Sequence, residues 1–143
     1  MKHLHLALAL SATLLFTACG GGGSSKSSIQ GSWVTGHCSK FTGTSKNNHL
    51  SFTKDKMTKT YYRYYGRECD ANEIYFKQVV HYSYRTSEES LFYTVESVET
   101  PIITDGQLGH LAPQAGKSYV SKYKLFPELK RMVLGSSSYH RVN

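Results

Sequence analysis

The sequence predicts an all-β fold, in the form of an eight-strand antiparallel up-and-down barrel, with a β-sandwich as the alternative. Its 143 residues include 11 Tyr and 6 Phe, and Thr and Val are also frequent, which are residue types that strands favour. No long stretch repeats apolar residues at the 3.6-residue spacing of an amphipathic helix. Short segments bounded by turn signals follow one another along most of the chain, as in sandwiches and barrels.

The first 18 residues have the pattern of a signal peptide. A cationic start is followed by a run from Leu4 to Phe16 that consists almost entirely of Leu and Ala. This run is too short to span a bilayer, which takes about 20 apolar residues. A short apolar run followed by small residues before a cleavage site is typical of secretion. We therefore expect residues 1–18 to be removed on export.

The sequence FTAC at residues 16–19 ends the apolar run. It resembles the lipobox of bacterial lipoproteins, and this resemblance implies that Cys19 is lipidated with acyl chains such as palmitate. Gly20, which follows the cysteine, implies sorting to the outer membrane if the host is Gram-negative. Two acyl chains anchor a protein stably where one is marginal. An ordinary signal peptide with an incidental cysteine is the alternative.

A flexible tether is predicted after the cysteine. Residues 20–28 are Gly, Ser and a single Lys, a composition that behaves as a random coil. Its root-mean-square reach is about 17 Å. Residues 19–28 would thus hold a folded domain close to a membrane. The remaining segment, residues 29–143, has about 115 residues, which is enough for one domain.

Eight strands are predicted in this domain, and turn signals separate most of them. The strands are residues 32–38, 49–53, 57–65, 73–86, 91–104, 117–126, 130–134 and 139–142. Because several are long and their connections short, we expect an antiparallel meander that closes on itself and so removes its edges. Residues 105–116 form the longest connection without a strand pattern, and we expect either a binding loop or a mobile hairpin tip there.

Alternation along each strand predicts which side chains face the interior. In residues 57–65 the inward set is Thr58, Thr60, Tyr62 and Tyr64. The outward set is Met57, Lys59, Tyr61, Arg63 and Tyr65. In residues 73–86 the inward set is Ile74, Phe76, Gln78, Val80, Tyr82 and Tyr84. In the later strands the inward residues are Leu91, Tyr93, Val95, Tyr119, Tyr123 and Leu125.

Tyrosine is concentrated on these inward faces, although a buried hydroxyl needs a hydrogen-bond partner. One interpretation is a cavity lined by aromatic rings, with hydroxyls that orient a small ligand. The other is a closed core in which the hydroxyls bond to one another, to Gln78 and to the threonines. The candidate ligand-binding residues are Tyr62, Tyr64, Phe76, Tyr82, Tyr84, Tyr119 and Tyr123.

The cysteine count predicts a disulfide. Once Cys19 is assigned to lipidation, Cys38 and Cys69 remain, and an exported pair is expected to be oxidised. The bond would close a loop of about 31 residues and stabilise the fold by roughly 3.5–4 kcal/mol in the chain-entropy model. The alternative is a metal site of Cys38, His37 and a distant histidine. Neither a C-x-x-C nor an H-x-x-x-H spacing supports it, so we predict the disulfide and no metal.

The triplet GSW at residues 31–33 opens the first predicted strand. Together with an eight-strand meander it resembles the lipocalin or calycin superfamily. This resemblance implies that Trp33 closes the barrel floor and that Arg141, in the last strand, packs across its indole. With the YYRYY run at residues 61–65, the triplet also resembles small bacterial lipocalin-like lipoproteins. Likeness of fold does not by itself establish a function.

Charge is unevenly distributed along the chain. Without residues 1–18 the formal charge is +6, and residues 40–67 hold seven basic and one acidic residue. Residues 68–105 hold eight acids and two bases, whereas residues 106–143 hold six bases and one acid. In a closed meander the two basic segments become neighbours. The basic flank is interpreted either as a solvated face that aids solubility or as a contact for anionic envelope lipids.

Patterns typical of a catalytic site are missing. The histidines after residue 18 are scattered: His37, His49, His81, His110 and His140. The serines at 136–138 lack the strand–turn–helix setting of an activated nucleophile, and the glycines at 20–23 precede no strand–helix unit. We expect no enzyme, cofactor or nucleic-acid partner.

Two functions remain open from the sequence. The first is an outer-membrane lipoprotein whose lipocalin-like barrel binds a small amphipathic or hydrophobic ligand. The second is a cell-envelope interaction or structural module with a filled barrel. A cavity between the tyrosines distinguishes the two.

Overall fold

A computed structural model describes residues 28–35, 38–99, 102–103 and 113–142. The predicted signal peptide, Cys19 and most of the tether lie outside these residues, as does most of the 105–116 loop. The strands are β1 (Gly31–Thr35), β2 (Ser39–Phe41), β3 (Thr44–Phe52), β4 (Lys56–Tyr65), β5 (Ile74–Ser87), β6 (Ser90–Val98), β7 (Ile102–Ile103), β8 (Ser118–Phe126), β9 (Arg131–Leu134) and β10 (Ser137–Val142). Two 3₁₀ turns, η1 (Ala71–Glu73) and η2 (Pro127–Leu129), accompany them.

Eight of these strands close into an antiparallel barrel, which confirms the predicted fold class. The order around the ring is β1-β10-β9-β8-β6-β5-β4-β3, and β1 pairs with both β10 and β3. This double pairing of β1 is the join that distinguishes a barrel from a sandwich. β1 therefore lies between the two basic segments of the chain, with β10 on one side and β3 on the other.

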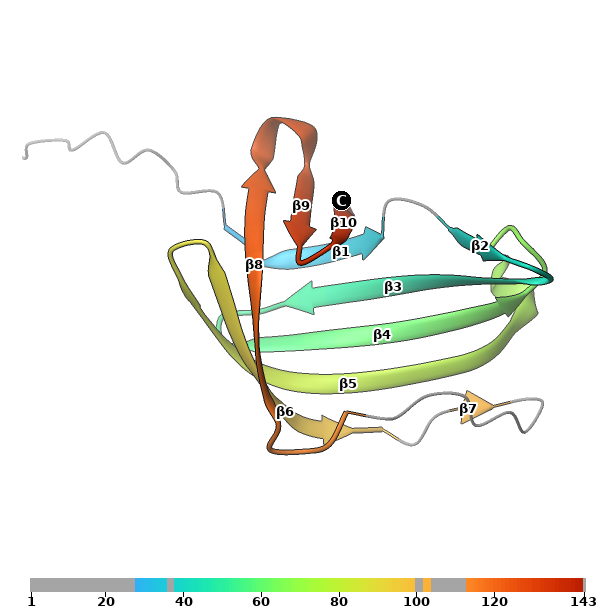
Figure 1. Cartoon of the computed structure of the whole chain (residues 1–143), viewed down its shortest axis with the longest axis horizontal. Coiled ribbons are helices and arrows are strands. Elements are labelled where there is room, and N and C mark those ends of the chain that lie inside the picture. The colour runs from blue at the N-terminus through green and yellow to red at the C-terminus, as the bar shows by residue number, and fades with distance from the viewer. Residues whose placement is uncertain (1–27, 36–37, 100–101, 104–112, 143) are drawn as a thin grey trace, which may run out of the picture.

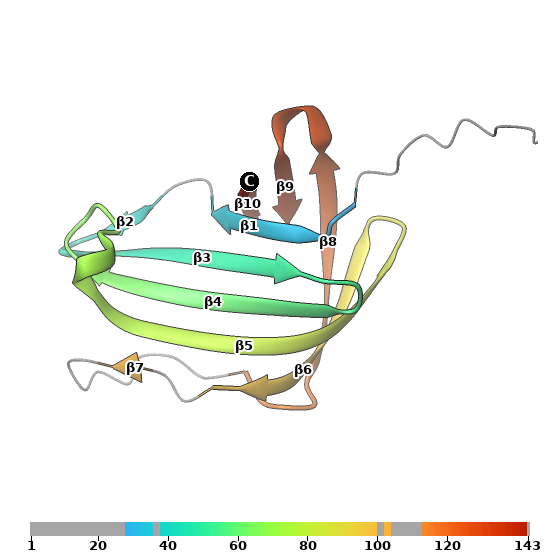
Figure 2. The ribbon, with the colours of Figure 1, turned by 180° about the vertical axis from the view of Figure 1, so that it is seen from behind.

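The ring is asymmetric, because its strands range from 4 residues in β9 to 14 in β5. β3, β4 and β5 run side by side beyond the rest of the barrel, and β2 and β7 pair with β3 and β5 outside the ring (Figure 1). β8 crosses these long strands steeply, in front of them in Figure 1 and behind them in Figure 2. Among the described residues no helix has the length and apolar character to span a membrane.

Two strand predictions need correction. Residues 44–48, expected to be a turn, form the first half of β3. Their polar sequence TSKNN is a weak strand former, but it is paired with β4 on one side and partly with β2 on the other. The predicted strand 91–104 ends at Val98, and residues 102–103 form the separate β7.

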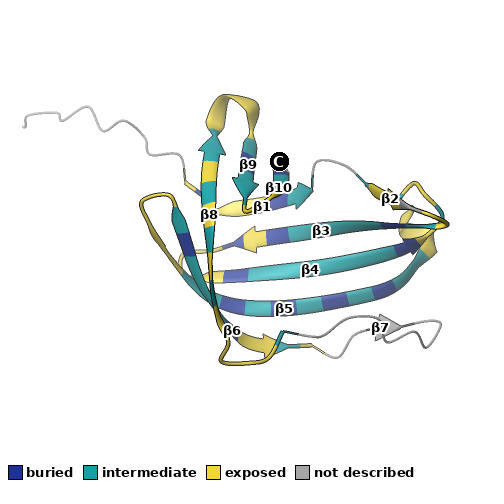
Figure 3. Cartoon of the chain, in the orientation of Figure 1, coloured by how far each residue is buried: buried dark blue, intermediate teal, exposed yellow. Residues whose placement is uncertain are grey.

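The inward faces of β5, β6 and β8 follow the predicted alternation (Figure 3). Phe76, Gln78, Val80 and Tyr82 are buried on β5, and Leu91 is buried on β6. The buried core draws on most strands of the ring: Ile29, Trp33, Leu50, Phe52, Met57, Val80, Tyr82, Leu91, Val95, Met132 and Tyr139.

The assignment of faces in β4 is wrong. Met57 is 2% exposed and Tyr61 packs against the core, so the face that carries them and Lys59 points inward. Tyr62 lies on the other face, where its ring contacts those of His49 and Tyr64 at centroid distances of 4.9 and 6.1 Å. Met57 is the only aliphatic side chain of the strand, and its burial decides which face turns inward.

Candidate functional site

The barrel contains a cavity of about 170 Å³. Residues from six strands line it, together with Pro113 beside the undescribed part of the 105–116 loop: Leu50, Met57, Lys59, Tyr61, Tyr82, Tyr93, Tyr119 and Leu134. An engineered apolar cavity of about 150 Å³ in another protein holds a benzene molecule. The barrel cavity is therefore large enough for about one aromatic ring.

Tyrosines from three neighbouring strands form one wall of the cavity. The rings of Tyr82 in β5 and Tyr93 in β6 meet edge to face at 5.5 Å, and Tyr93 stacks on Tyr119 in β8 at the same distance. Tyr93 and Tyr119 are direct cross-strand partners, so the register of β6 against β8 sets this stack. The Tyr93 hydroxyl also forms a hydrogen bond with Ser121 Oγ at 3.1 Å. Such aromatic pairs contribute about 0.5–1.5 kcal/mol each beyond burial and stiffen the wall.

Lys59 brings a positive charge into this aromatic setting. Its Nζ lies 4.6 Å from the centroid of the Tyr61 ring. Burial alone lowers the pKa of Lys59, but Tyr61, Tyr139 and Tyr93 around it more than offset this effect, so its pKa lies above the ordinary value. The ammonium group is therefore charged at neutral pH.

The phenols of Tyr82 and Tyr139 are neutral at the same pH. Burial is the main reason that the pKa values of Tyr82 and Tyr139 are raised above the ordinary value of tyrosine. A neutral phenol is a hydrogen-bond donor as well as an acceptor. The cavity thus combines apolar rings, phenolic donors and one ammonium group.

Only part of the predicted ligand-binding set lines the cavity. Tyr82 and Tyr119 do, whereas Phe76 is buried elsewhere in the sheet. Tyr84 donates a hydrogen bond to the carbonyl of Thr53 at 2.6 Å, and Tyr123 packs against the core. Tyr62 and Tyr64 are on the opposite face of β4.

The other lining residues were missed as candidates, and those among them with polar groups are Lys59, Tyr61 and Tyr93. Tyr93 was assigned inward but was not included in the ligand set. Lys59 and Tyr61 were lost with the wrong face of β4. The signal that identifies them is Met57, since residues at positions 57, 59 and 61 share a face.

The predicted contact between Arg141 and Trp33 is present. Arg141 in β10 lies over the Trp33 ring, with Cζ 5.0 Å from the ring centroid. The Trp33 indole N–H donates to the carbonyl of Ile29 at 2.8 Å. Arg141 Nη2 donates to the carbonyls of Ser28, at 3.1 Å, and Gln30. The first strand and the segment before it are thus fastened to the last strand.

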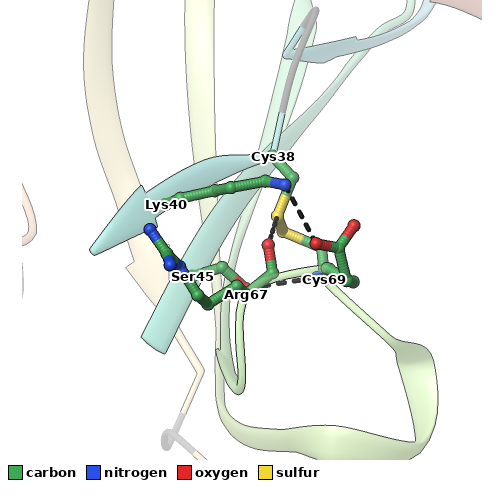
Figure 4. A network of polar contacts seen from close by, with 6 residues as sticks. Cys38, Lys40, Ser45, Arg67 and Cys69 are labelled. Carbon is green, nitrogen blue, oxygen red and sulfur yellow. Dashed lines mark hydrogen bonds and ion pairs between the residues drawn. A yellow bond between two sulfur atoms is a disulfide. The ribbon is translucent and has the colours of Figure 1, made fainter. Parts of the chain in front are cut away.

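The predicted disulfide is also present and lies at the β2 end of the long strands (Figure 4). Cys38 and Cys69 are bonded, with their Cα atoms 5.8 Å apart. Beside the bond, Lys40 forms an ion pair with Glu68 at 2.9 Å, and the Cys69 amide donates to Ser45 Oγ at 3.2 Å. The bond ties the short strand β2 to the loop that joins β4 and β5.

A larger hollow, of about 450 Å³, lies on the outer face of β5, β6 and β8. There the guanidinium of Arg85 lies 4.0 Å from the centroid of the Phe92 ring, and Val120 is 62% exposed. Tyr93 and Tyr119 line both this hollow and the interior cavity. Among the described residues, no three His, Cys, Asp or Glu side chains are grouped so that they could hold a metal ion.

No protein-family model, curated protein or solved structure matches the chain.

Proposed function

We propose that this protein is a lipid-anchored protein of the bacterial outer membrane whose barrel binds a small amphipathic or hydrophobic ligand. The observation that carries the proposal is the 170 Å³ cavity within a closed barrel. Its lining is mostly aromatic and aliphatic, with a few polar groups directed at one space, which is the composition typical of small-molecule sites.

The anchor is supported by the sequence around Cys19, where an apolar leader precedes the cysteine and a Gly/Ser tether follows it. The Cys38–Cys69 disulfide is consistent with export, because such bonds persist in oxidising compartments. An anchored barrel would capture its ligand beside the membrane surface.

A second candidate is an envelope interaction module whose barrel carries no ligand. The small volume of the cavity favours it, since pockets for drug-sized ligands typically measure about 300–1,000 Å³. Exposed Val120 and Leu129, at 62% and 61%, are apolar groups that a protein partner would cover. Occupancy of the cavity decides between the two candidates.

Native mass spectrometry tests the proposal. Residues 20–143 would be exported to a periplasm without the lipidation site, purified without detergent and sprayed before and after incubation with envelope extract. We expect a discrete adduct that is lost on denaturation. Leu134→Trp, which fills the cavity, should abolish the adduct, whereas Val120→Trp on the outer face should retain it. A bare mass in every sample would contradict ligand binding and leave the interaction module.

A further inference from the structure

Lys59 occupies a position that normally belongs to the core. It pairs with Leu50 of β3 on one side and with Val80 of β5 on the other. These neighbours are 1% and 0% exposed. Along β4 the inward residues before and after the lysine are Met57 and Tyr61, and both pack in the core. A long apolar side chain would fit this place without bringing in a charge.

The charge of Lys59 has no carboxylate partner in the described part of the chain. Each Asp and Glu there is exposed, and none of them lines the cavity. Its Nζ instead lies 4.6 Å from the centroid of the Tyr61 ring, a cation–π contact. Lys59 is half-buried and lines the cavity, so its ammonium group is available to an anion bound there.

Phenol groups surround the ammonium from several strands. Tyr61 lies beside it on β4, and Tyr82, Tyr93 and Tyr119 line the same cavity from β5, β6 and β8. An anionic oxygen placed here would receive a charge-assisted hydrogen bond from Lys59 and further bonds from the phenols. The same place offers little to a cation, which Lys59 would repel.

The rest of the cavity is suited to the apolar part of a ligand. Leu50, Met57 and Leu134 line it together with the tyrosine rings. The volume of about 170 Å³ limits that part to about one ring or a short branched chain.

From these observations we propose that the ligand is a small carboxylate that carries an aromatic ring or a short branched apolar group, and that Lys59 is its counter-ion. The inference rests on the proposed function, since it names the chemical class of the ligand that the barrel binds. Lys59 is in this respect a specificity-determining residue: it selects the charge of the ligand, while the rings select its size.

Three probes of one size and different charge test the inference. Benzoate, benzyl alcohol and benzylamine would be titrated into the soluble protein and followed by two-dimensional NMR, which detects weak binding. We expect benzoate to bind at least about tenfold more tightly than the alcohol, and the amine to bind most weakly. Lys59→Met should remove the preference, so that benzoate and the alcohol bind about equally. Lys54→Met, which removes the same charge from an exposed turn, should keep it.

The outcomes separate the two proposals. If benzyl alcohol binds the unmodified protein as tightly as benzoate, or if Lys59→Met keeps the preference, the role of Lys59 is refuted while ligand binding stands. If no probe binds and the native mass is bare as well, the proposed function itself fails. Thermal unfolding gives an independent readout, because benzoate should raise the melting temperature of the unmodified protein and of Lys54→Met but not that of Lys59→Met.

Discussion

Arg141, near the end of the last strand, lies over the indole of Trp33 in the first strand, with 5.0 Å between the guanidinium carbon and the ring centroid. The two residues face each other in the β1–β10 register. The contact therefore lies at the join where the two ends of the barrel sheet meet. Arg141 also donates hydrogen bonds to two carbonyls just before β1, so it links the segment that precedes the first strand to the last strand.

Replacing Arg141 by Ala should lower the free energy of unfolding by about 1–2 kcal/mol, since it removes a cation–π contact and hydrogen bonds to Ser28 and Gln30. Denaturation in urea measures the change. His140→Ala, at the exposed neighbouring position, is the control and should change little. Equal effects of the two substitutions would show that the join does not depend on the Arg141 contact.

The glycine of the GSW triplet, Gly31, has a backbone conformation that other residues rarely adopt. Its φ is +116°, and a Cβ atom there would lie 3.4 Å from Arg141 Nε. Gly31→Ala should therefore destabilise the fold by about 1–3 kcal/mol, through backbone strain and displacement of Arg141. Gly43→Ala is the matched control, because its φ is +74° but no atom lies within 4 Å of the added carbon. A larger loss in Gly43→Ala would contradict this account.

Much of the fold could be predicted because β5 and β8 carry their apolar residues mainly on one face. In β5 the sequence alternates from Phe76 through Val80 to Tyr82, and each of these is buried. Residues 44–48 were missed because their strand conformation comes from pairing with neighbouring strands and not from their own residue types. The alternation of apolar and polar residues thus predicts a strand only where the strand buries one face and exposes the other.

The site was predicted less well, and the reason lies in β4. This strand carries tyrosines on both faces, so tyrosine content cannot tell which face turns inward. A choice of the wrong face exchanges every inward residue for an outward one. Tyr62 and Tyr64 were thus assigned to the cavity in place of Lys59 and Tyr61. The Arg141–Trp33 contact was implied by the resemblance that the GSW triplet carries, and the disulfide was predicted from the cysteine count, so neither depended on the choice of strand faces.

Reduction of the Cys38–Cys69 bond should lower the free energy of unfolding by roughly 3–4 kcal/mol, because the bond closes a loop of 31 residues in the unfolded chain. Urea denaturation with and without reductant measures this loss. The Cys38→Ser/Cys69→Ser double variant should match the reduced protein and show no further response to reductant. An unchanged midpoint after complete reduction would mean that native contacts such as Lys40–Glu68 hold the loop without the bond.

The buried phenols should make the barrel sensitive to alkali. Burial raises the pKa values of Tyr82 and Tyr139 in the folded state, so these groups keep their protons at a pH where unfolded tyrosines, with a pKa of about 10, lose them. The unfolded state is therefore favoured as pH rises above about 10, and the stabilisation from these groups is fully present below that pH. Urea denaturation at several pH values, with tyrosinate absorbance followed in parallel, measures the effect.

Tyr82→Phe should reduce this dependence on pH, since it removes the hydroxyl that resists ionisation but keeps the ring against Tyr93. Tyr65→Phe is the control, because Tyr65 is 45% exposed. We expect the decline in stability above pH 10 to be shallower in Tyr82→Phe than in Tyr65→Phe. Identical slopes in the two variants would show that Tyr82 ionises as readily in the barrel as in the unfolded chain, and that the cavity wall is accessible to water.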